Sequence, residues 1–185
     1  LQSVIPLPLQ IDTSDTQAVA RAMRRYNGKP MINSVSGKAE SMAAVFPLVR
    51  KYGGVVVGLA LDEGGIPETA EGRLAVARKI YDTAAEYGIP SEDIVIDGLT
   101  LTVSSEPEAA VVTLETLRRV RDELGGHTIL GVSNVSFGLP RRDIINANFF
   151  AMALEAGLSC AIINPLAEGM MGAWRSYCAL AGLDS

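Results

Sequence analysis

Short apolar runs alternate with longer amphipathic segments along the whole chain, and four of the apolar runs end on a single carboxylate or carboxamide. These four polar residues are Asp12, Asn33, Asp97 and Asn134. Short continuous apolar runs are typical of strands that are buried on both faces, and the segments between them have the periodicity of helices. Regular strand–helix alternation predicts an α/β fold with a parallel sheet.

The alternation predicts six strands, each followed by a helix. We expect strands at 7–12, 31–34, 55–61, 93–97, 128–133 and 160–164. We expect helices at about 16–26, 39–52, 69–87, 107–124, 141–156 and 168–181. Glycines follow most of these helices, as is common at helix ends. No linker or charge block interrupts the pattern, so residues 1–185 are expected to form a single domain.

Six strand–helix units leave two architectures open. An eight-stranded parallel barrel typically needs about 250 residues, more than the 185 present. The chain is therefore predicted to be either an open doubly wound sheet or a barrel whose first two strand–helix units precede Leu1.

Composition excludes several classes of function. The formal net charge of −5 is spread without a basic stripe, which argues against nucleic-acid binding. One histidine and two cysteines at no useful spacing make a metal site unexpected. No phosphate-binding loop supports a nucleotide site. A signal segment and a membrane-spanning run are both missing, so we expect a cytoplasmic protein without a membrane partner.

The four polar strand ends are the best candidates for a site. Side chains at the C-terminal ends of the strands of a parallel barrel converge at one end, where active sites are built. Two carboxylates and two carboxamides there would suit a flat heterocycle rich in amide groups, because they offer both donors and acceptors. Individually, Asp12 or Asp97 could instead cap a helix, and Asn134 could form a turn. Arg142 opens a helix at the same end and could contact an anionic or carbonyl-rich ligand.

Five segments of the chain resemble motifs of a known family and occur in the same order as in that family. They are 11–15 (IDTSD), 30–37 (PMINSVSG), 61–70 (LDEGGIPETA), 95–101 (VIDGLTL) and 130–140 (LGVSNVSFGLP). Together they resemble the pterin-binding barrel of cobalamin-dependent methionine synthase and of methyltetrahydrofolate:corrinoid methyltransferases. The segments 151–158 and 162–166 also match, and they favour the methionine synthase branch of the family.

The resemblance implies a (β/α)8 TIM barrel of which this chain supplies strands 3 to 8. It implies that the pterin is bound by Asp12, Asn33, Asp97 and Asn134, with Arg142 nearby. Asn134 and Asp97 would carry the catalytic roles. One departure is Gly98, where the family usually has proline. Without that rigid turn, the direction of the Asp97 side chain stays open.

The resemblance also implies an activity, a methyl transfer from N5 of methyltetrahydrofolate to cob(I)alamin in methionine biosynthesis. The cobalamin would be supplied by a corrinoid domain or protein, and a homodimer stays open. Two alternatives remain: a folate-binding module or fragment without catalysis, and a dihydropteroate synthase. The second would need basic residues on the late strands for its pyrophosphate, where this chain has Ser133 and Asn134.

Overall fold

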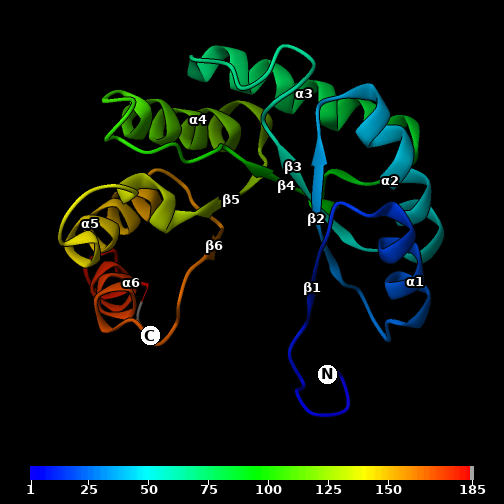
Figure 1. The fold of residues 1–185 in the computed structure, drawn as a ribbon, viewed down its shortest axis with the longest axis horizontal. Helices are drawn as coiled ribbons and strands as arrows, with labels where there is room; N and C mark the ends of the chain where they lie inside the picture. The colour runs from blue at the N-terminus through cyan, green and yellow to red at the C-terminus, as the bar shows by residue number, and fades with distance from the viewer. Residues whose placement is uncertain (184–185) are drawn as a thin grey trace. The chain divides into compact units, whose positions relative to one another are not determined.

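The computed structural model describes residues 1–183, which fold into two compact units. The first unit contains residues 1–67 and 72–97, and the second contains residues 68–71 and the chain from Gly98 onward. Figure 1 shows the alternation of strands and helices along the chain. Among residues 1–183, no helix has the length and apolar character needed to cross a membrane.

The first unit is a four-stranded parallel sheet with helices between its strands. Its strands are β1 (Gln10–Asp12), β2 (Met31–Ser36), β3 (Val55–Leu59) and β4 (Ile94–Asp97). Its helices are α1 (Thr16–Arg25), α2 (Ala39–Tyr52), α3 (Ala70–Glu86) and a short 3-10 helix, η1 (Ser91–Asp93). Each strand pairs with the next one along the chain. Doubly wound sheets reverse their strand order instead, so this unit has the pairing of a barrel.

The helices of the first unit pack on one face of its sheet. A Cβ built on Gly58 of β3 would lie 3.1 Å from Ile80 of α3 and 3.3 Å from Ile96 of β4. Gly58 and Ile96 are register partners and therefore share this face. Ile80 and Ile96 are fully buried there. Because side chains alternate along a strand, the neighbours of Gly58 point to the opposite face.

The second unit contains a parallel pair of strands and three helices. The strands are β5 (His127–Gly131) and β6 (Cys160–Ile162), and a 3-10 helix, η2 (Val132–Ser136), follows β5. The helices are α4 (Ala109–Leu124), α5 (Arg142–Glu155) and α6 (Glu168–Leu180). Leu117, Leu130 and Ala153 are fully buried at the centre of its apolar core.

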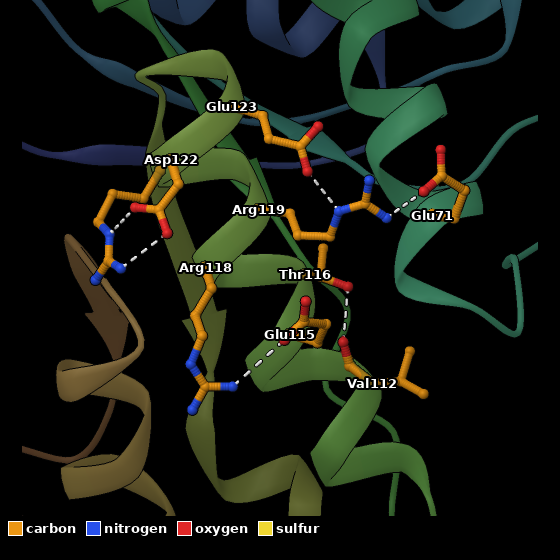
Figure 2. A network of polar contacts seen from close by, with 9 residues as sticks. Glu71, Val112, Glu115, Thr116, Arg118, Arg119, Asp122 and Glu123 are labelled. Atoms are coloured by element: carbon orange, nitrogen blue, oxygen red, sulfur yellow. Dashed lines mark hydrogen bonds and ion pairs between the residues drawn. The ribbon is translucent and has the colours of Figure 1, made fainter.

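Ion pairs tie residues 68–71 to helix α4. Figure 2 shows Arg119 between two carboxylates, donating to Glu71 and, over 2.6 Å, to Oε1 of Glu123. The hydrogen bonds to Glu123 and then Glu71 raise the pKa of Arg119 above its usual range. Arg118 pairs with Glu115 on the same helix. Among these contacts, the pair between Glu71 and Arg119 joins the segment 68–71 to α4, which belongs to the same unit.

The predicted α/β class with parallel strands is confirmed, and helix α2 has its predicted bounds. Two strand predictions were wrong in ways that matter for the site. The strand expected at 31–34 continues to Ser36, because Val35 and Ser36 pair with Gly58 and Leu59 after an irregularity in register.

The strand expected at 128–133 ends at Gly131, and Asn134 lies in the 3-10 helix η2. The physical reason is the length of its neighbour. Strand β6 ends at Ile162, whose register partner is Gly131, so the ladder between these two strands stops there. The first strand is also shorter than expected and begins at Gln10, while His127 joins the start of β5.

Candidate functional site

Asp12 and Asn33 form the first part of the candidate site. They are register partners on β1 and β2. The Asn33 amide nitrogen Nδ2 lies 3.3 Å from Oδ2 of Asp12, to which it donates a hydrogen bond. Asp12 is exposed and Asn33 is half-buried. The pair therefore presents its remaining amide and carboxylate groups to solvent at the C-terminal end of two adjacent strands.

Asp97 lies on the same face of this sheet as the pair. Asn33 is in register with Val57, and Asp97 is in register with Leu59. Val57 and Leu59 are two residues apart on β3, so their side chains share a face. That face is opposite to the one on which α3 packs against Gly58. Asp97 lies about 7 Å further along the strand direction than the pair, since each strand residue rises about 3.3 Å.

Neither Asp12 nor Asp97 is the N-cap residue of the helix that follows it. The N-cap of α1 is Asp15, whose Oδ1 accepts hydrogen bonds from the backbone N–H groups of Gln17 (2.8 Å) and Ala18 (3.3 Å). The helix after Asp97 is α4, which begins at Ala109 with Glu108 as its N-cap residue.

A pocket of about 280 Å³ lies between helices α1 and α2, where Val19 of α1 and Val45 of α2 line it. Thr13 and Ser34, the residues that follow Asp12 and Asn33, line it together with Lys38. Asp12 and Asn33 are not among the residues that line this pocket.

Asn134 is exposed and lies against the backbone of Gly131. A Cβ at Gly131 would come within 3.1 Å of Nδ2 of Asn134, closer than ordinary van der Waals contact. Within residues 1–183 the carboxamide of Asn134 makes no side-chain hydrogen bond. The missing side chain at Gly131 therefore leaves space for an amide that can both donate to and accept from a ligand.

Arg142 contacts the loop that carries Asn134 through two hydrogen bonds and an aromatic ring. Its Nε donates to Oγ of Ser136 over 2.9 Å, and its Nη2 donates to the carbonyl oxygen of Ser133 over 2.9 Å. The guanidinium carbon lies 4.4 Å from the centre of the Phe137 ring, a cation–π distance. Nε and Nη2 of Arg142 therefore both donate to oxygens of the protein itself.

The segment after β4 holds the other side of this loop. The hydroxyl of Thr102 donates to the carbonyl oxygen of Phe137 over 2.7 Å, and that of Ser104 donates to the same oxygen over 2.8 Å. The backbone N–H of Val103 donates to the carbonyl oxygen of Val135 over 3.0 Å. The loop from Ser133 to Phe137 is thus anchored from two directions within the second unit.

A family profile described as pterin binding enzyme matches residues 1–164. The chain belongs to this family.

Two curated relatives cover most or all of the chain. It is 28% identical to the methylcorrinoid:tetrahydrofolate methyltransferase of Eubacterium limosum in an alignment 189 residues long, which covers 100% of this chain and 69% of that protein. It is 33% identical to the methionine synthase of Mycobacterium tuberculosis over 171 residues, covering 85% of this chain. The matched region is only 14% of that methionine synthase.

A solved structure shows the same fold. The chain superposes on the dihydropteroate synthase of Clostridium difficile, determined in the presence of pteroic acid, with a TM-score of 0.76. The match covers 97% of this chain and 70% of that one at 20% sequence identity. At this identity the likeness establishes the fold. The predicted fold class, six strand–helix units of a barrel, agrees with it.

The structure brings some of the predicted site residues together within each unit. Asp12, Asn33 and Asp97 share one face of the first unit. Asn134 and Arg142 share one loop and its anchoring helix in the second unit. That all five contact a single ligand stays a prediction.

Sequence reasoning missed the residues that anchor the loop, namely Ser136, Asn146, Thr102 and Ser104. Ser136 is fully buried and donates to Oδ1 of Asn146 over 2.7 Å. The only hint in the sequence was the density of small polar residues in segment 130–140, which also fits an ordinary turn.

Proposed function

We propose that this chain binds 5-methyltetrahydrofolate and transfers its N5-methyl group to cob(I)alamin carried by a corrinoid domain or protein. The observation that carries the proposal is the similarity over the whole chain to a methyltransferase named for the same pair of reactants. The name of that relative describes the transfer from methylcorrinoid to tetrahydrofolate. This is the same reaction in the opposite direction, and it requires the same site.

The first unit would bind the pterin. Asp12, Asn33 and Asp97 share a face opposite to the packed helices, which supports a common ligand. Asp97 would accept hydrogen bonds from a ring N–H and the exocyclic amine, a charge-assisted and geometrically selective pairing. Asn33 and Asp12 would contact the remaining ring edge, with their mutual hydrogen bond fixing both side chains.

The chemical difficulty lies at N5. When the N5–methyl bond breaks, both bonding electrons stay on nitrogen, so the acceptor must supply the electron pair for the new bond. Cob(I)alamin would supply that pair. A tertiary amine is a poor leaving group, and N5 must therefore gain a proton or a strong hydrogen bond before the methyl group departs.

Asn134 would assist this step. A carboxamide can accept a hydrogen bond from protonated N5 and donate one to neutral N5 after transfer. Donors and acceptors held in place where charge changes stabilise the transition state more than the ground state. Asn134 is exposed and its neighbour Phe137 is 49% exposed, so an acceptor brought by a partner could reach a methyl group bound beside it.

The proposal is tested by two measurements on the same preparation. A calorimetric titration with 5-methyltetrahydrofolate measures binding, and the absorbance of cob(I)alamin then reports its methylation. Binding with transfer supports the proposal. Binding without transfer would instead favour the folate-binding module, and the lack of any binding would favour an inert fragment. The homodimer and the cytoplasmic location expected from the sequence stay predictions.

A further inference from the structure

Ser136 is the centre of a buried polar network behind Asn134. Its hydroxyl is fully buried, donates to Oδ1 of Asn146 over 2.7 Å, and accepts from Nε of Arg142 over 2.9 Å. Ser136 lies two residues after Asn134 on η2, and its side-chain partners, Asn146 and Arg142, lie on α5. Its hydroxyl also lies 3.3 Å from the carbonyl oxygen of Ser133 on η2. A fully buried hydroxyl has no surface to offer a ligand. Its hydrogen bonds can influence the site only through the loop.

Arg142 contacts the loop on both sides of Asn134. It binds the carbonyl oxygen of Ser133 before Asn134, and the hydroxyl of Ser136 and the ring of Phe137 after it. A guanidinium is a rigid planar fork, so three contacts of this kind fix the position of the loop relative to α5. Asn134 itself stays without a side-chain hydrogen bond among residues 1–183.

We propose that Arg142, Ser136 and Asn146 are positioning residues that fix the loop of Asn134 relative to α5 for methyl transfer, and that Arg142 acts through this loop without contacting the ligand. This inference rests on the proposed function. It gives Arg142 a different role from the ligand contact that its place at the start of a helix first indicated.

The physical reason is orientation. A carboxamide assists the breaking bond only when its oxygen and nitrogen point at N5, and small misplacements of reacting groups are costly in rate. Ser136→Ala removes the hydroxyl and leaves Nε of Arg142 and Oδ1 of Asn146 without their partner. Both residues are half-buried, and such polar groups rearrange or bind water when they lose a partner, so the loop would lose its fixed place.

The first experiment compares Ser136→Ala with Ser176→Ala, an exposed serine on α6. The wild-type chain is first shown to bind 5-methyltetrahydrofolate and to methylate cob(I)alamin, and failure here would overturn the proposed function itself. If it succeeds, we expect Ser136→Ala to lower the transfer rate about 10-fold or more, the scale of a lost preorganised contact, with pterin affinity within about 2-fold. Ser176→Ala should match wild type. A Ser136→Ala rate equal to wild type would overturn the inference alone.

The second experiment separates positioning from charge at Arg142. Arg142→Lys keeps the positive charge but loses the fork, so we expect it to lose transfer rate as Arg142→Ala does, with pterin affinity retained. Arg175→Lys on α6 is the matched control. Weakened pterin binding that lysine restores and alanine does not would show a ligand contact by Arg142 and overturn the inference. This comparison also decides the question if Ser136→Ala fails to fold.

A double-mutant cycle gives the last readout. Residues that act through Asn134 cannot matter once its amide is removed. In the Asn134→Ala background, Arg142→Lys should therefore slow transfer by less than about 2-fold, although alone it slows transfer strongly. Fully additive losses would mean that Arg142 acts independently of Asn134 and would contradict the proposal.

Discussion

The two units present their candidate residues in different ways. In the first unit, Asp12, Asn33 and Asp97 are strand residues whose direction is fixed by the register of the sheet. In the second unit, Asn134 lies beyond the end of β5 in a 3-10 helix, and its loop is fixed by side-chain hydrogen bonds. The sheet positions its candidate residues through backbone pairing and needs no additional side-chain hydrogen bonds. The loop depends on a side-chain hydrogen-bond network that single substitutions can break.

This difference separates binding from catalysis in the proposed function. The pterin ring must be held in place, and the residues proposed to bind it lie on rigid strands. The group that must follow a change in protonation at N5 is exposed, free of protein hydrogen bonds within residues 1–183, and carried by an anchored loop.

Asn134→Ala should have the largest effect. It removes the group proposed to stabilise N5 as the methyl group leaves, and loss of one such contact typically costs about 100-fold in rate. We expect transfer to slow by about this factor and methyltetrahydrofolate binding to weaken. Stopped-flow absorbance of cob(I)alamin measures the rate, and calorimetry measures the affinity. Wild-type values for both would remove Asn134 from the site.

Asp97→Asn should mainly weaken binding. It replaces charge-assisted hydrogen bonds with neutral ones, a loss of about 1–2 kcal/mol, which corresponds to roughly 10-fold in pterin affinity. The dissociation constant from calorimetry is the measurement. If affinity were unchanged while the transfer rate fell, Asp97 would belong with Asn134 and the division between the units would fail.

Gly131→Ala tests the space behind Asn134. The added Cβ would lie 3.1 Å from Nδ2 of Asn134, so the amide must move. We expect transfer to slow by about 10-fold, because catalysis is sensitive to sub-ångström placement, with pterin affinity and the melting temperature nearly unchanged. Gly172→Ala is the control, because a Cβ there meets no atom within 4 Å. Equal rates in both variants would show that the position of Asn134 is not limiting.

A smaller effect concerns Glu63, whose side chain binds the backbone at the start of helix α2. Its Oε1 accepts from the backbone N–H of Ala39 over 2.8 Å, and its Oε2 accepts from Lys79 over 2.9 Å. The hydrogen bond from Lys79 is the main cause that lowers the pKa of Glu63 to about 2.

A depressed carboxylate pKa means that the folded state holds this proton less tightly than the unfolded state, whose value is near 4.5. The stability from Glu63 should be present above pH 4.5 and decline as the pH falls towards 2. Urea unfolding should therefore show Glu63→Gln less stable than wild type at neutral pH, with the difference shrinking in acid. Glu40→Gln is the control, and a difference that grows in acid would contradict the assignment.

The sequence allowed the elements to be predicted where periodicity and caps agree. Helix α2 runs from Ala39 to Tyr52 as expected. The positions of Asp12 and Asp97 at strand ends were also predictable, because an apolar run that stops at a carboxylate fixes both the strand and its end.

The loop of Asn134 could not be predicted in the same way. Val132 and Val135 continue the apolar character of β5, but the strand stops at Gly131 because β6 offers no further partner. The hydrogen bonds of Ser136 with Asn146 and Arg142 join residues that are not at helical or strand spacing. No periodic pattern in the sequence therefore predicts them. The irregular end of β2 after Asn33 likewise depends on pairing with β3, which the local sequence does not contain.

The most direct test of the central claim is a single-turnover methyl transfer, in which the chain is saturated with 5-methyltetrahydrofolate and mixed with cob(I)alamin. The account predicts loss of the cob(I)alamin absorbance at a rate that depends on the chain, with the same amount of tetrahydrofolate formed, and a rate about 100-fold lower for Asn134→Ala. Tight pterin binding with no chain-dependent loss of cob(I)alamin would contradict it.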